Sequence, residues 1–397
     1  MDLNSLLKRA VDAGASDLHL KLGRPPSVRH DGEITPLDLP PLTDDDLDSL
    51  LRGVTADSPK RYDQFQESGD LDIAYTAEGL PRFRVNVFRQ RGAISFALRV
   101  IPITVPSFEA LGLPQGVHQL AEEHRGLILV TGATGSGKTT TLASIIDHIN
   151  RTRRSHIVTV EDPIEIMHQD QLSIVNQREI GLDTESFGQA LRRALRQDPD
   201  TILIGELRDA ETAQTALQAA ESGHLVFSTL HTIDAAETIG RMIEYFPPGK
   251  QQQIRSIMAG VLRGVISQRL LPRLGGGRVA AIELMINNAR IADLIRENKP
   301  EEIEAAIADG EFAKMQTFQK ALIGHVIAGT VDRDVAANAS TNRHDFMVAL
   351  EYAEKAHSAG IDHTASSSAS ALTSEPEFEP EPEPEPEFAL RLAPMGE

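Results

Sequence analysis

The stretch Leu127-Ile-Leu-Val-Thr-Gly-Ala-Thr-Gly-Ser-Gly-Lys-Thr139 decides the fold of this 397-residue chain. Its first four residues form a short apolar run typical of a buried strand, and the pattern Gly-x-x-x-x-Gly-Lys-Thr follows at residues 132–139. Apolar residues then recur at helical spacing, namely Leu142, Ile145, Ile146 and Ile149. Because strand, glycine-rich loop and helix are the context that this pattern requires, the sequence predicts a phosphate-binding loop and not a chance cluster of glycines.

The predicted loop supplies the groups that a nucleoside triphosphate needs. Glycines let backbone N–H groups converge on the β-phosphate, and the start of the helix adds its positive end. Lys138 is expected to reach the outer phosphates, and the hydroxyl of Thr139 to bind Mg²⁺. The residues predicted to bind ATP are Gly132, Ala133, Thr134, Gly135, Ser136, Gly137, Lys138, Thr139 and Thr140.

A second apolar strand, at residues 157–160, is followed by three acidic residues, Glu161, Asp162 and Glu165. Nucleotides bind at the carboxyl edge of a parallel sheet, so an acid placed here could orient the water that attacks a phosphate. The alternative is an acidic loop that only caps the following segment.

A third strand, Thr201-Ile-Leu-Ile204, leads into Gly205 and Glu206 and resembles a Walker B strand. Gly205 stands where many such strands have the aspartate that is coupled to Mg²⁺. Glu206 is therefore the acid predicted to act there. Together with an apolar run at residues 225–227, these strands and the helical stretches between them predict an α/β domain with a mainly parallel sheet.

Two histidines, His224 and His231, lie on either side of the strand predicted at residues 225–230. A metal site is disfavoured because an odd separation sends two side chains of a regular strand to opposite faces. The sequence also has no cysteine to complete a zinc site. Two interpretations stay open for these histidines, namely nucleotide sensing or coupling, and an ordinary structural role.

The first 100 residues predict a small α+β module. An amphipathic helix is expected over residues 3–11, and apolar and polar residues alternate near residues 71–75, 83–87 and 94–100, which is typical of strands.

Two arginines of this module are predicted to point outward. Arg84 and Arg99 fall on the face of their strands opposite the apolar one. The segment that follows contains Pro102, Pro106 and Pro114, which indicates a linker to the next domain.

The composition restricts the kinds of partner. With a formal net charge of −19, binding to nucleic-acid phosphates would need a local basic patch, so no nucleic-acid partner is expected. No stretch approaches the ~18 apolar residues of a membrane span, and the start of the chain does not resemble a signal peptide, so no membrane insertion is expected. The lack of cysteine suits a reducing compartment.

The end of the chain has a different composition. Serine and alanine dominate after residue 357, and a Glu-Pro alternation follows, with eight glutamates and one arginine from Glu375 onward. Such a segment cannot form a core, so a disordered acidic tail is predicted, either as a solvated spacer or as a docking segment.

These elements, taken together, resemble the secretion-ATPase superfamily and, within it, the family of type IV pilus retraction ATPases. The resemblance extends from residue 1 to about residue 340 in the order and spacing of its motifs. The motifs are Ala15-Ser-Asp-Leu-His-Leu20, Arg82-Phe-Arg-Val-Asn86, residues 132–139, residues 161–165, residues 198–209, residues 223–232, Ser267-Gln-Arg-Leu270 and Leu294-Ile-Arg-Glu297.

The resemblance implies an α/β chain with an N-terminal PAS-like α+β domain at residues 1–100 and a linker at 101–116. A RecA-like P-loop ATPase domain with C-terminal helices is implied at 117–356, ahead of the disordered tail at 357–397. The function that it implies is a homohexameric, ATP-hydrolysing motor for pilus retraction and twitching motility. Such a motor is cytoplasmic, at the inner face of the inner membrane, where it meets a platform protein and the rest of the pilus machinery.

The resemblance also implies roles for individual residues. Glu165 is the catalytic acid of the family's Asp box, and Glu206 is the Walker B acid that faces Mg²⁺. Arg84 and Arg99 are the arginines that the N-terminal domain brings to the phosphates, although a salt-bridged surface arginine is the alternative for each.

Three further assignments follow from the family's motifs. His224 and His231 belong to the His box, and Arg241 is a conformational or interface contact. Leu294-Ile-Arg-Glu297 resembles the retraction motif, although Asp293 replaces the asparagine expected before it.

Two other functions remain in competition. A pilus assembly or type II secretion ATPase uses the same engine, but usually has a four-cysteine insertion and a larger N-terminal region, and this chain has neither. A nucleotide-gated scaffold with little turnover would not need Glu165, Glu206 and the two arginines, because binding alone does not require them.

Overall fold

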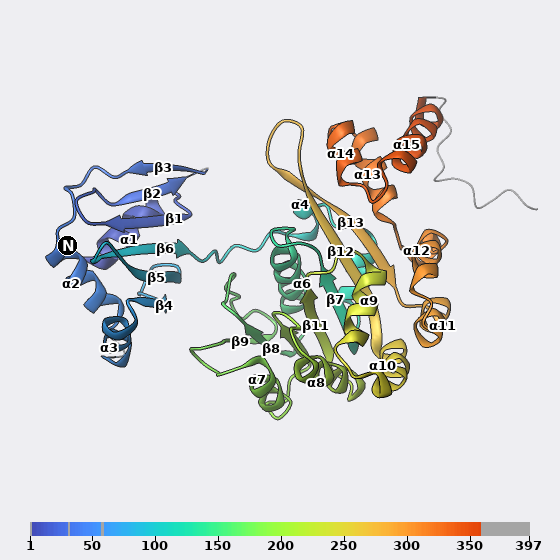
Figure 1. Cartoon of the computed structure of the whole chain (residues 1–397), viewed down its shortest axis with the longest axis horizontal. Helices are drawn as coiled ribbons and strands as arrows, with labels where there is room; N and C mark the ends of the chain where they lie inside the picture. Colours follow the sequence, from blue (N-terminus) through green and yellow to red (C-terminus); the bar gives the residue numbers. More distant parts are fainter. Residues whose placement is uncertain (1, 31, 57–58, 359–397) are drawn as a thin grey trace, which may run out of the picture.

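The computed structural model describes all residues except 1, 31, 57–58 and 359–397, and it divides into two bodies joined by an extended segment (Figure 1). The predicted tail lies outside the described residues apart from residues 357 and 358, which end the last helix. No helix among the described residues is both long enough and apolar enough to cross a membrane.

The smaller body is an antiparallel six-stranded sheet in the order β3-β2-β1-β6-β5-β4, packed against three helices. The predicted helix and the three predicted strands are all present in it, and the sequence patterns did not indicate β1 to β3. The elements are α1 (Leu3–Asp12), β1 (Asp17–Lys21), β2 (Ser27–His30), β3 (Glu33–Pro36), α2 (Asp44–Val54), α3 (Pro59–Ser68), β4 (Asp70–Tyr75), β5 (Phe83–Gln90) and β6 (Ala93–Val100).

The larger body is built on a seven-stranded sheet in the order β13-β12-β7-β11-β10-β8-β9. All neighbouring pairs are parallel except β12 with β13. The prediction of a mainly parallel sheet is therefore confirmed. Its strands are β7 (Gly126–Thr131), β8 (His156–Glu161), β9 (Ile174–Glu179), β10 (Thr201–Ile204), β11 (Leu225–Leu230), β12 (Leu262–Pro272) and β13 (Arg278–Ile286).

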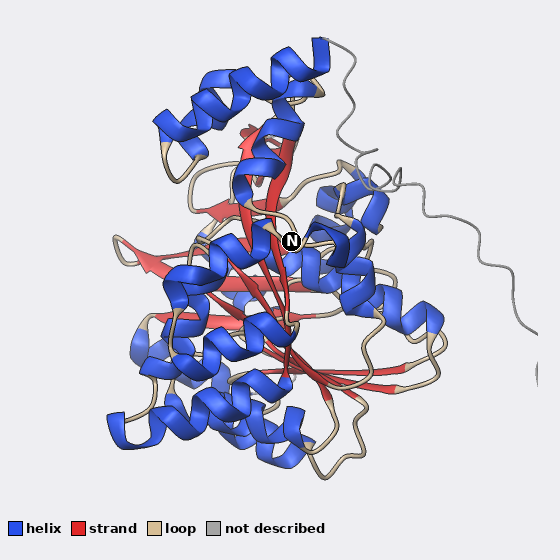
Figure 2. Cartoon of the chain, turned by 90° about the vertical axis from the view of Figure 1, so that its right-hand side faces the viewer, coloured by secondary structure: helices blue, strands red, loops and turns tan. Residues whose placement is uncertain are grey.

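Strand β7 is buried on both faces, which explains its unbroken apolar run. Leu127 and Leu129 pack into one core with the helices within residues 210–308, whereas Ile128 and Val130 pack into another with the helices within residues 108–152. Successive side chains of a strand point to opposite faces, so a strand between two helical layers must be apolar at every position. Helices accordingly lie on both sides of the strands in Figure 2.

The helices of the larger body are those between and after these strands. Their bounds are α4 (Phe108–Leu111), α5 (Gln115–Ala121), α6 (Lys138–Thr152), α7 (Phe187–Ala194), α8 (Ala210–Glu221), α9 (Ala235–Glu244), α10 (Pro248–Val261), α11 (Ala289–Glu297), α12 (Ile303–Ala308), α13 (Phe318–Ile327), α14 (Arg333–Ala339) and α15 (Arg343–Ser358), with 3₁₀ turns at Pro300–Glu302 and Glu311–Ala313.

The last three helices form a separate small core around Leu322, Phe346 and Leu350. Arg269 of β12 fixes this unit to the sheet, because its guanidinium bonds to Thr341 and the Ala339 carbonyl and lies 3.9 Å from the Phe318 ring centroid.

The connection between the bodies is shorter than residues 101–116. Helix α4 lies inside that range, and its Phe108 and the following Leu113 are buried in the core of the larger body. The prolines alone did not indicate this, because a four-residue helix has too few positions to show a period.

Candidate active site

The glycine-rich loop links β7 to α6, as the sequence predicts. Gly132 has φ of +139°, and a Cβ there would lie 2.4 Å from the Gln268 carbonyl, so only glycine fits. Gly137, with φ of +93°, precedes α6, whose first residue is Lys138. The loop therefore presents backbone N–H groups at the start of a 15-residue helix, which is the geometry that binds phosphate.

Lys138 is largely buried and folds back on its own loop. Its Nζ donates to the carbonyls of Gly132 and Ala133 at 2.7 and 3.0 Å, and it lies 3.4 Å from Nδ1 of His231. Burial lowers the pKa of Lys138, while the nearby charges of Glu206 and Glu165 oppose that shift. An incoming phosphate would offer this ammonium a full negative charge in place of two neutral carbonyls.

The three acids at the end of β8 have different environments. Glu161 is buried and accepts from Thr159 at 2.6 Å and from Gln177 at 3.1 Å, and burial raises its pKa. Asp162 pairs with Arg208 at 3.1 Å. Glu165 is exposed and lines the pocket beside residues 134–140 of the glycine-rich loop, which is called the main pocket below. It is therefore the acid of the three that is free to act on a bound ligand.

Glu206 stands just beyond the end of β10 and connects the other charged groups. One of its carboxylate oxygens accepts from Arg208 at 2.8 Å, and the other lies 3.1 Å from Nε2 of His231. The preceding Gly205 has close neighbours, since a Cβ there would lie 3.3 Å from the Val160 carbonyl. A larger residue would press on β8, which is the physical reason for a glycine at this place.

The two histidines lie at opposite ends of β11, His224 just before it and His231 just after it. His231 lies in the pocket between Lys138 and Glu206. His224 lies at the other end of β11, where its Nδ1 is 3.0 Å from both the Ala219 carbonyl and the Ser222 hydroxyl, at the end of α8. The structure thus brings one member of the predicted pair to the phosphate loop.

The predicted arginines also differ in their surroundings. Arg84 and Arg99 both point outward, at 47% and 69% side-chain exposure, which confirms the predicted register. Arg99 lines the main pocket and donates to Asp17 at 2.8 Å. Arg84 lies 3.9 Å from Asp72.

Arg241 belongs to a neighbouring hollow instead of the main pocket. It pairs with Glu244 at 3.6 Å and lies over the Tyr245 ring. That hollow also includes Glu206 and His231, so it adjoins the phosphate site from the side of α9.

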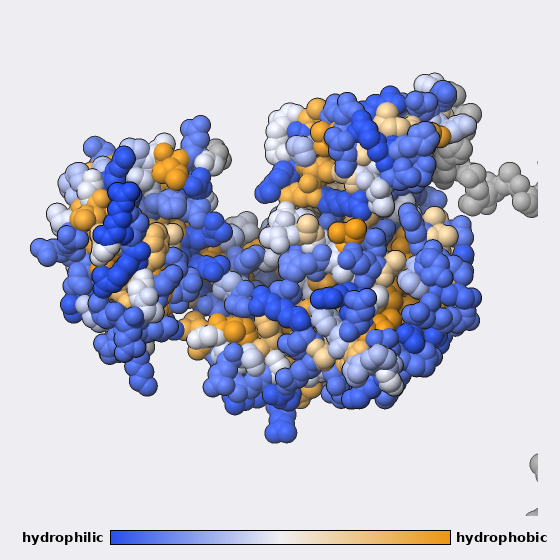
Figure 3. All heavy atoms as spheres, viewed as in Figure 1, coloured by the Kyte–Doolittle hydropathy of each residue, from blue (hydrophilic) through white to orange (hydrophobic). Residues whose placement is uncertain are grey.

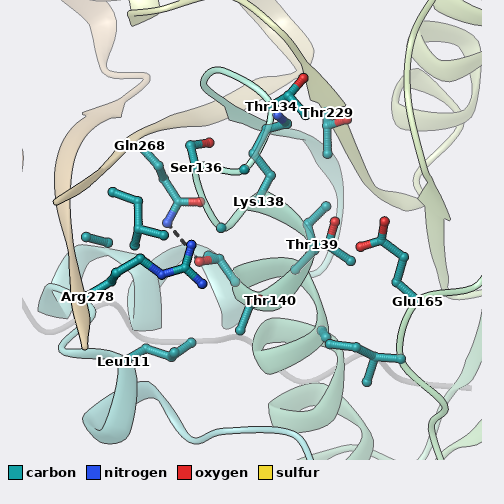
Figure 4. A pocket seen from close by; sticks show the side chains of 18 of the residues that line it. Leu111, Thr134, Ser136, Lys138, Thr139, Thr140, Glu165, Thr229, Gln268 and Arg278 are labelled. Atoms are coloured by element: carbon teal, nitrogen blue, oxygen red, sulfur yellow. Dashed lines mark hydrogen bonds between the residues drawn. The ribbon is translucent and has the colours of Figure 1, made fainter. Parts of the chain in front are cut away.

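The main pocket has a volume of about 1230 Å³, which is ample for a nucleotide. Figure 4 shows Glu165 on one side, Gln268 with Arg278 on the other, and Lys138 and Thr139 between them. The pocket also includes Thr134 to Thr140 of the predicted set.

Several lining residues were not predicted, among them Leu111, Arg208, Gln268 and Arg278. Gln268 is buried, and its side-chain Nε2 donates to the Thr141 hydroxyl at 2.8 Å. Its side-chain oxygen, Oε1, has no hydrogen-bond partner. A buried amide in a strand carries no signal in a single sequence, although Ser267-Gln-Arg-Leu270 is one of the quoted motifs.

The residues fit Mg²⁺ delivered with the nucleotide. In the described part of the chain, no group of three or more acids or histidines is arranged to hold a metal ion. Mg²⁺ in phosphate-cleaving proteins takes most of its ligands from phosphate and water and needs few from the protein. The Thr139 hydroxyl and the Glu206 carboxylate both line the pocket and suit this use.

Comparison with known proteins matches residues 81–281 to the family model described as type II/IV secretion system protein. The chain is 45% identical to the type IV pilus retractation ATPase PilT of Pseudomonas aeruginosa over 336 residues, 85% of this chain and 97% of that protein. It is 42% identical to a twitching motility protein of Neisseria gonorrhoeae, over 80% of this chain and 84% of that one.

Among solved structures, the chain is similar to the crystal structure of the pilus retraction motor PilT with bound ADP. That structure is 48% identical, has a TM-score of 0.81, and is matched over 87% of this chain and 98% of its own.

Proposed function

The chain belongs to the family of type II/IV secretion system proteins and is an ATPase of the PilT type, and on this premise we propose that it is a homohexameric motor that powers retraction of type IV pili. The observation that carries the proposal is the cluster of Lys138, Glu206 and His231 at the phosphate loop, with Glu165 facing it. A chain that only bound nucleotide would not need two acids beside its phosphate loop.

The chemistry proposed for the site starts with phosphate binding. Lys138 leaves its two loop carbonyls for the outer phosphates of ATP, and Thr139 and Glu206 would hold the Mg²⁺ that accompanies the nucleotide. The metal would offset negative charge on the phosphates. Glu165 orients the attacking water. Glu206 contacts Arg208 and His231, so a movement of Glu206 on loss of the outer phosphate is transmitted to His231.

Arginines complete the proposed site. Arg99 and Arg84 approach the transferring phosphoryl group when the N-terminal domain closes on the ATPase domain, and such arginines are worth ~10³ or more in rate in other phosphate-cleaving enzymes. The outward direction of both side chains and the position of Arg99 at the pocket support this role.

The domain roles and partners are also part of the proposal. The antiparallel sheet of residues 1–100 with its helices supports a PAS-like domain. The linker ends before Phe108, and residues 108–356 form a RecA-like ATPase domain. Arg241 and His224 act in coupling, away from the bond that is cleaved. The hexamer works in the cytoplasm against a platform protein of the inner membrane.

Turnover distinguishes a motor from a nucleotide-gated scaffold. We expect the wild-type assembly to release phosphate steadily, and Glu206→Gln to bind ATP with similar affinity and release none above background. Glu206→Gln that keeps the wild-type rate would contradict the role of Glu206, and a wild type without turnover would contradict the motor.

Direction of work is tested in cells, because extension and retraction share the same chemistry. Deletion of the gene should leave cells with normal or excess surface pili and no twitching. Cells without pili would instead assign the chain to pilus assembly.

A further inference from the structure

A buried ion pair joins the two bodies of the molecule. Arg82 directly precedes β5 of the N-terminal domain, and Glu179 is the last residue of β9 in the ATPase domain. Nη2 of Arg82 lies 3.0 Å from Oε2 of Glu179, and the two side chains are only 16% and 11% exposed. The surface pair of Arg290 with Asp309 is, by contrast, 50% and 69% exposed. The pair between the domains is thus shielded from water and salt.

The same carboxylate also holds the segment that carries Glu165. Oε2 of Glu179 accepts the backbone N–H of Ile164 at 3.3 Å, one residue before Glu165. Glu179 is itself fixed, because its backbone N–H donates to Asp183 at 2.8 Å. One carboxylate therefore meets an arginine of the N-terminal domain on one side and the backbone beside Glu165 on the other.

A second contact fixes the segment from its other end. The backbone N–H of Met167 donates to the carbonyl of Pro102 at 3.1 Å, and Pro102 belongs to the connection between the domains. Ile164 and Ile166 are buried, so their side chains anchor the segment while Glu165 is exposed toward the pocket. Glu165 thus lies between two backbone hydrogen bonds. One is accepted by Glu179, which pairs with Arg82 of the N-terminal domain, and the other by Pro102 of the connection between the domains.

We propose that Arg82 and Glu179 form a positioning pair that sets the location of Glu165 according to the placement of the N-terminal domain. When the domain moves, Arg82 moves with it and leaves the Glu179 carboxylate buried without its cation. The carboxylate then turns away and releases the Ile164 N–H, and the anchor at Pro102 shifts with the linker. Glu165 keeps its working position while the Arg82–Glu179 pair is formed and loses that position when the pair separates.

Arg82 differs in this respect from the arginines assigned to the phosphates. Its guanidinium is directed at Glu179, and its Nε is buried without a hydrogen-bond partner, so the pair depends on a single hydrogen bond. It is a positioning residue and acts through Glu165. The inference rests on the proposed function in one respect, since it takes Glu165 to be the acid that serves hydrolysis.

The first test separates turnover from binding in the full-length assembly. Arg82→Gln should lower kcat about tenfold or more, because a misplacement of ~1 Å can cost ~10²-fold in rate, and should leave the KM for ATP within about threefold. Arg82→Lys, which restores the charge opposite Glu179, should recover much of the loss. Glu179→Gln keeps the acceptor for Ile164 and removes only the charge, and it should lower kcat in the same direction. The control is Arg52→Gln, whose partner Asp48 lies on the surface of the same domain.

The second test measures whether the two backbone hydrogen bonds on either side of Glu165 are kept. Hydrogen exchange of the backbone amides in residues 164–168 should become faster in Arg82→Gln than in wild type and stay unchanged in Arg52→Gln. A pair that only braced the two domains would leave the exchange in this segment as it is. Unchanged exchange together with unchanged kcat overturns the inference, and so does a loss of ATP binding that parallels the loss of kcat.

Failure of the inference can be told from failure of the proposed function. A wild type without turnover, or a Glu165→Gln variant that keeps the wild-type rate, counts against the proposed function. An active wild type, an inactive Glu165→Gln and an Arg82→Gln with normal kcat count against the positioning pair alone.

Discussion

At the scale of single residues, burial separates groups that look alike in the sequence. Glu161 is the last residue of β8, and Glu165 comes four residues later. Glu161 is nevertheless enclosed by Thr159 and Gln177, whereas Glu165 faces the pocket. Local motifs predict which residue types occur at an edge of the sheet. They do not predict which member of a cluster is solvated, because that depends on β9, a strand contributed by residues farther along the chain.

The phosphate-loop lysine offers a direct test at this scale. Lys138→Ala removes the cation that the outer phosphates require, and the remaining loop still presents its backbone N–H groups. We expect the affinity for ATP to fall by about two orders of magnitude or more, as for the loss of a charge-assisted contact in a partly buried site. Titration with a fluorescent ATP analogue measures it. Equal binding by wild type and Lys138→Ala would refute the phosphate-loop assignment, and Lys8→Ala, on the exposed surface of α1, is the control.

A second buried acid predicts a pH dependence of stability. Glu283 accepts the backbone N–H of Ala235 at 2.8 Å, and burial raises its pKa to about 7, with Asp234 and Glu304 adding to the shift and Arg269 opposing it. The native state takes up this proton as the pH falls through about 7, whereas the unfolded chain takes it up near the ordinary value of 4.5. The cost of an ionised Glu283 is therefore full above pH ~7 and disappears toward pH ~4.5.

Glu283→Gln should remove this cost, because glutamine keeps the acceptor for Ala235 and carries no charge. We expect the variant to be more stable than wild type at pH 8, by at most about 3 kcal/mol, and the gain to shrink at pH 5.5. Thermal unfolding at the two pH values measures the difference. A gain that is equal at both would mean that ionisation of Glu283 is not the cause, and Glu301→Gln, at an exposed position, should show neither effect.

At the scale of elements, the strands that could be predicted are those with unmixed patterns. β7, β8, β10 and β11 each contain a run of apolar residues, because almost all of their residues are buried. The edge strand β9, Ile174–Glu179, has polar residues on both faces, so its apolar residues follow neither the two-residue period of a strand nor the 3.6-residue period of a helix. β12 begins with a shift of register between Leu262 and Gly264, which breaks its alternation. Tertiary pairing, and not local preference, makes these segments strands.

Gly264 at that irregularity tests how tightly the sheet and α5 are packed. A Cβ at Gly264 would lie 2.7 Å from both the Leu120 side chain and the Met285 carbonyl. The Met285 carbonyl belongs to the backbone and cannot move away from a new Cβ as the end of a flexible side chain can. Gly264→Ala should therefore lower the free energy of unfolding by about 1–3 kcal/mol. Gly240→Ala, in the middle of α9 with open space around its Cβ, should instead be neutral or stabilising by up to ~1 kcal/mol. Chemical denaturation of both variants measures the contrast, and a stable Gly264→Ala would contradict the close packing.

At the scale of the whole molecule, the two bodies leave room to approach one another. Figure 3 shows a recess between them on a largely hydrophilic face. In this arrangement Arg99 pairs with Asp17, and Arg84 lies near Asp72, so both arginines have partners within their own domain. The sequence predicted that these side chains point outward. It could not predict their present partners, because those depend on the sheet order, which places β1 and β4 at opposite sides of β6 and β5.

Domain closure should exchange those internal partners for the phosphates of ATP. The chain has no cysteine, so Glu33→Cys and Glu185→Cys, both at exposed positions, would introduce one label on each body. Labelled subunits diluted into unlabelled assemblies report the distance within one chain. We expect a non-hydrolysable ATP analogue to shorten the mean distance between the two spin labels, as measured by double electron–electron resonance. The double variant Arg84→Ala with Arg99→Ala should bind the analogue without this shortening. A distance that is the same with and without saturating analogue would rule out closure as the working stroke, because a nucleotide can shift only an equilibrium whose two states it binds differently.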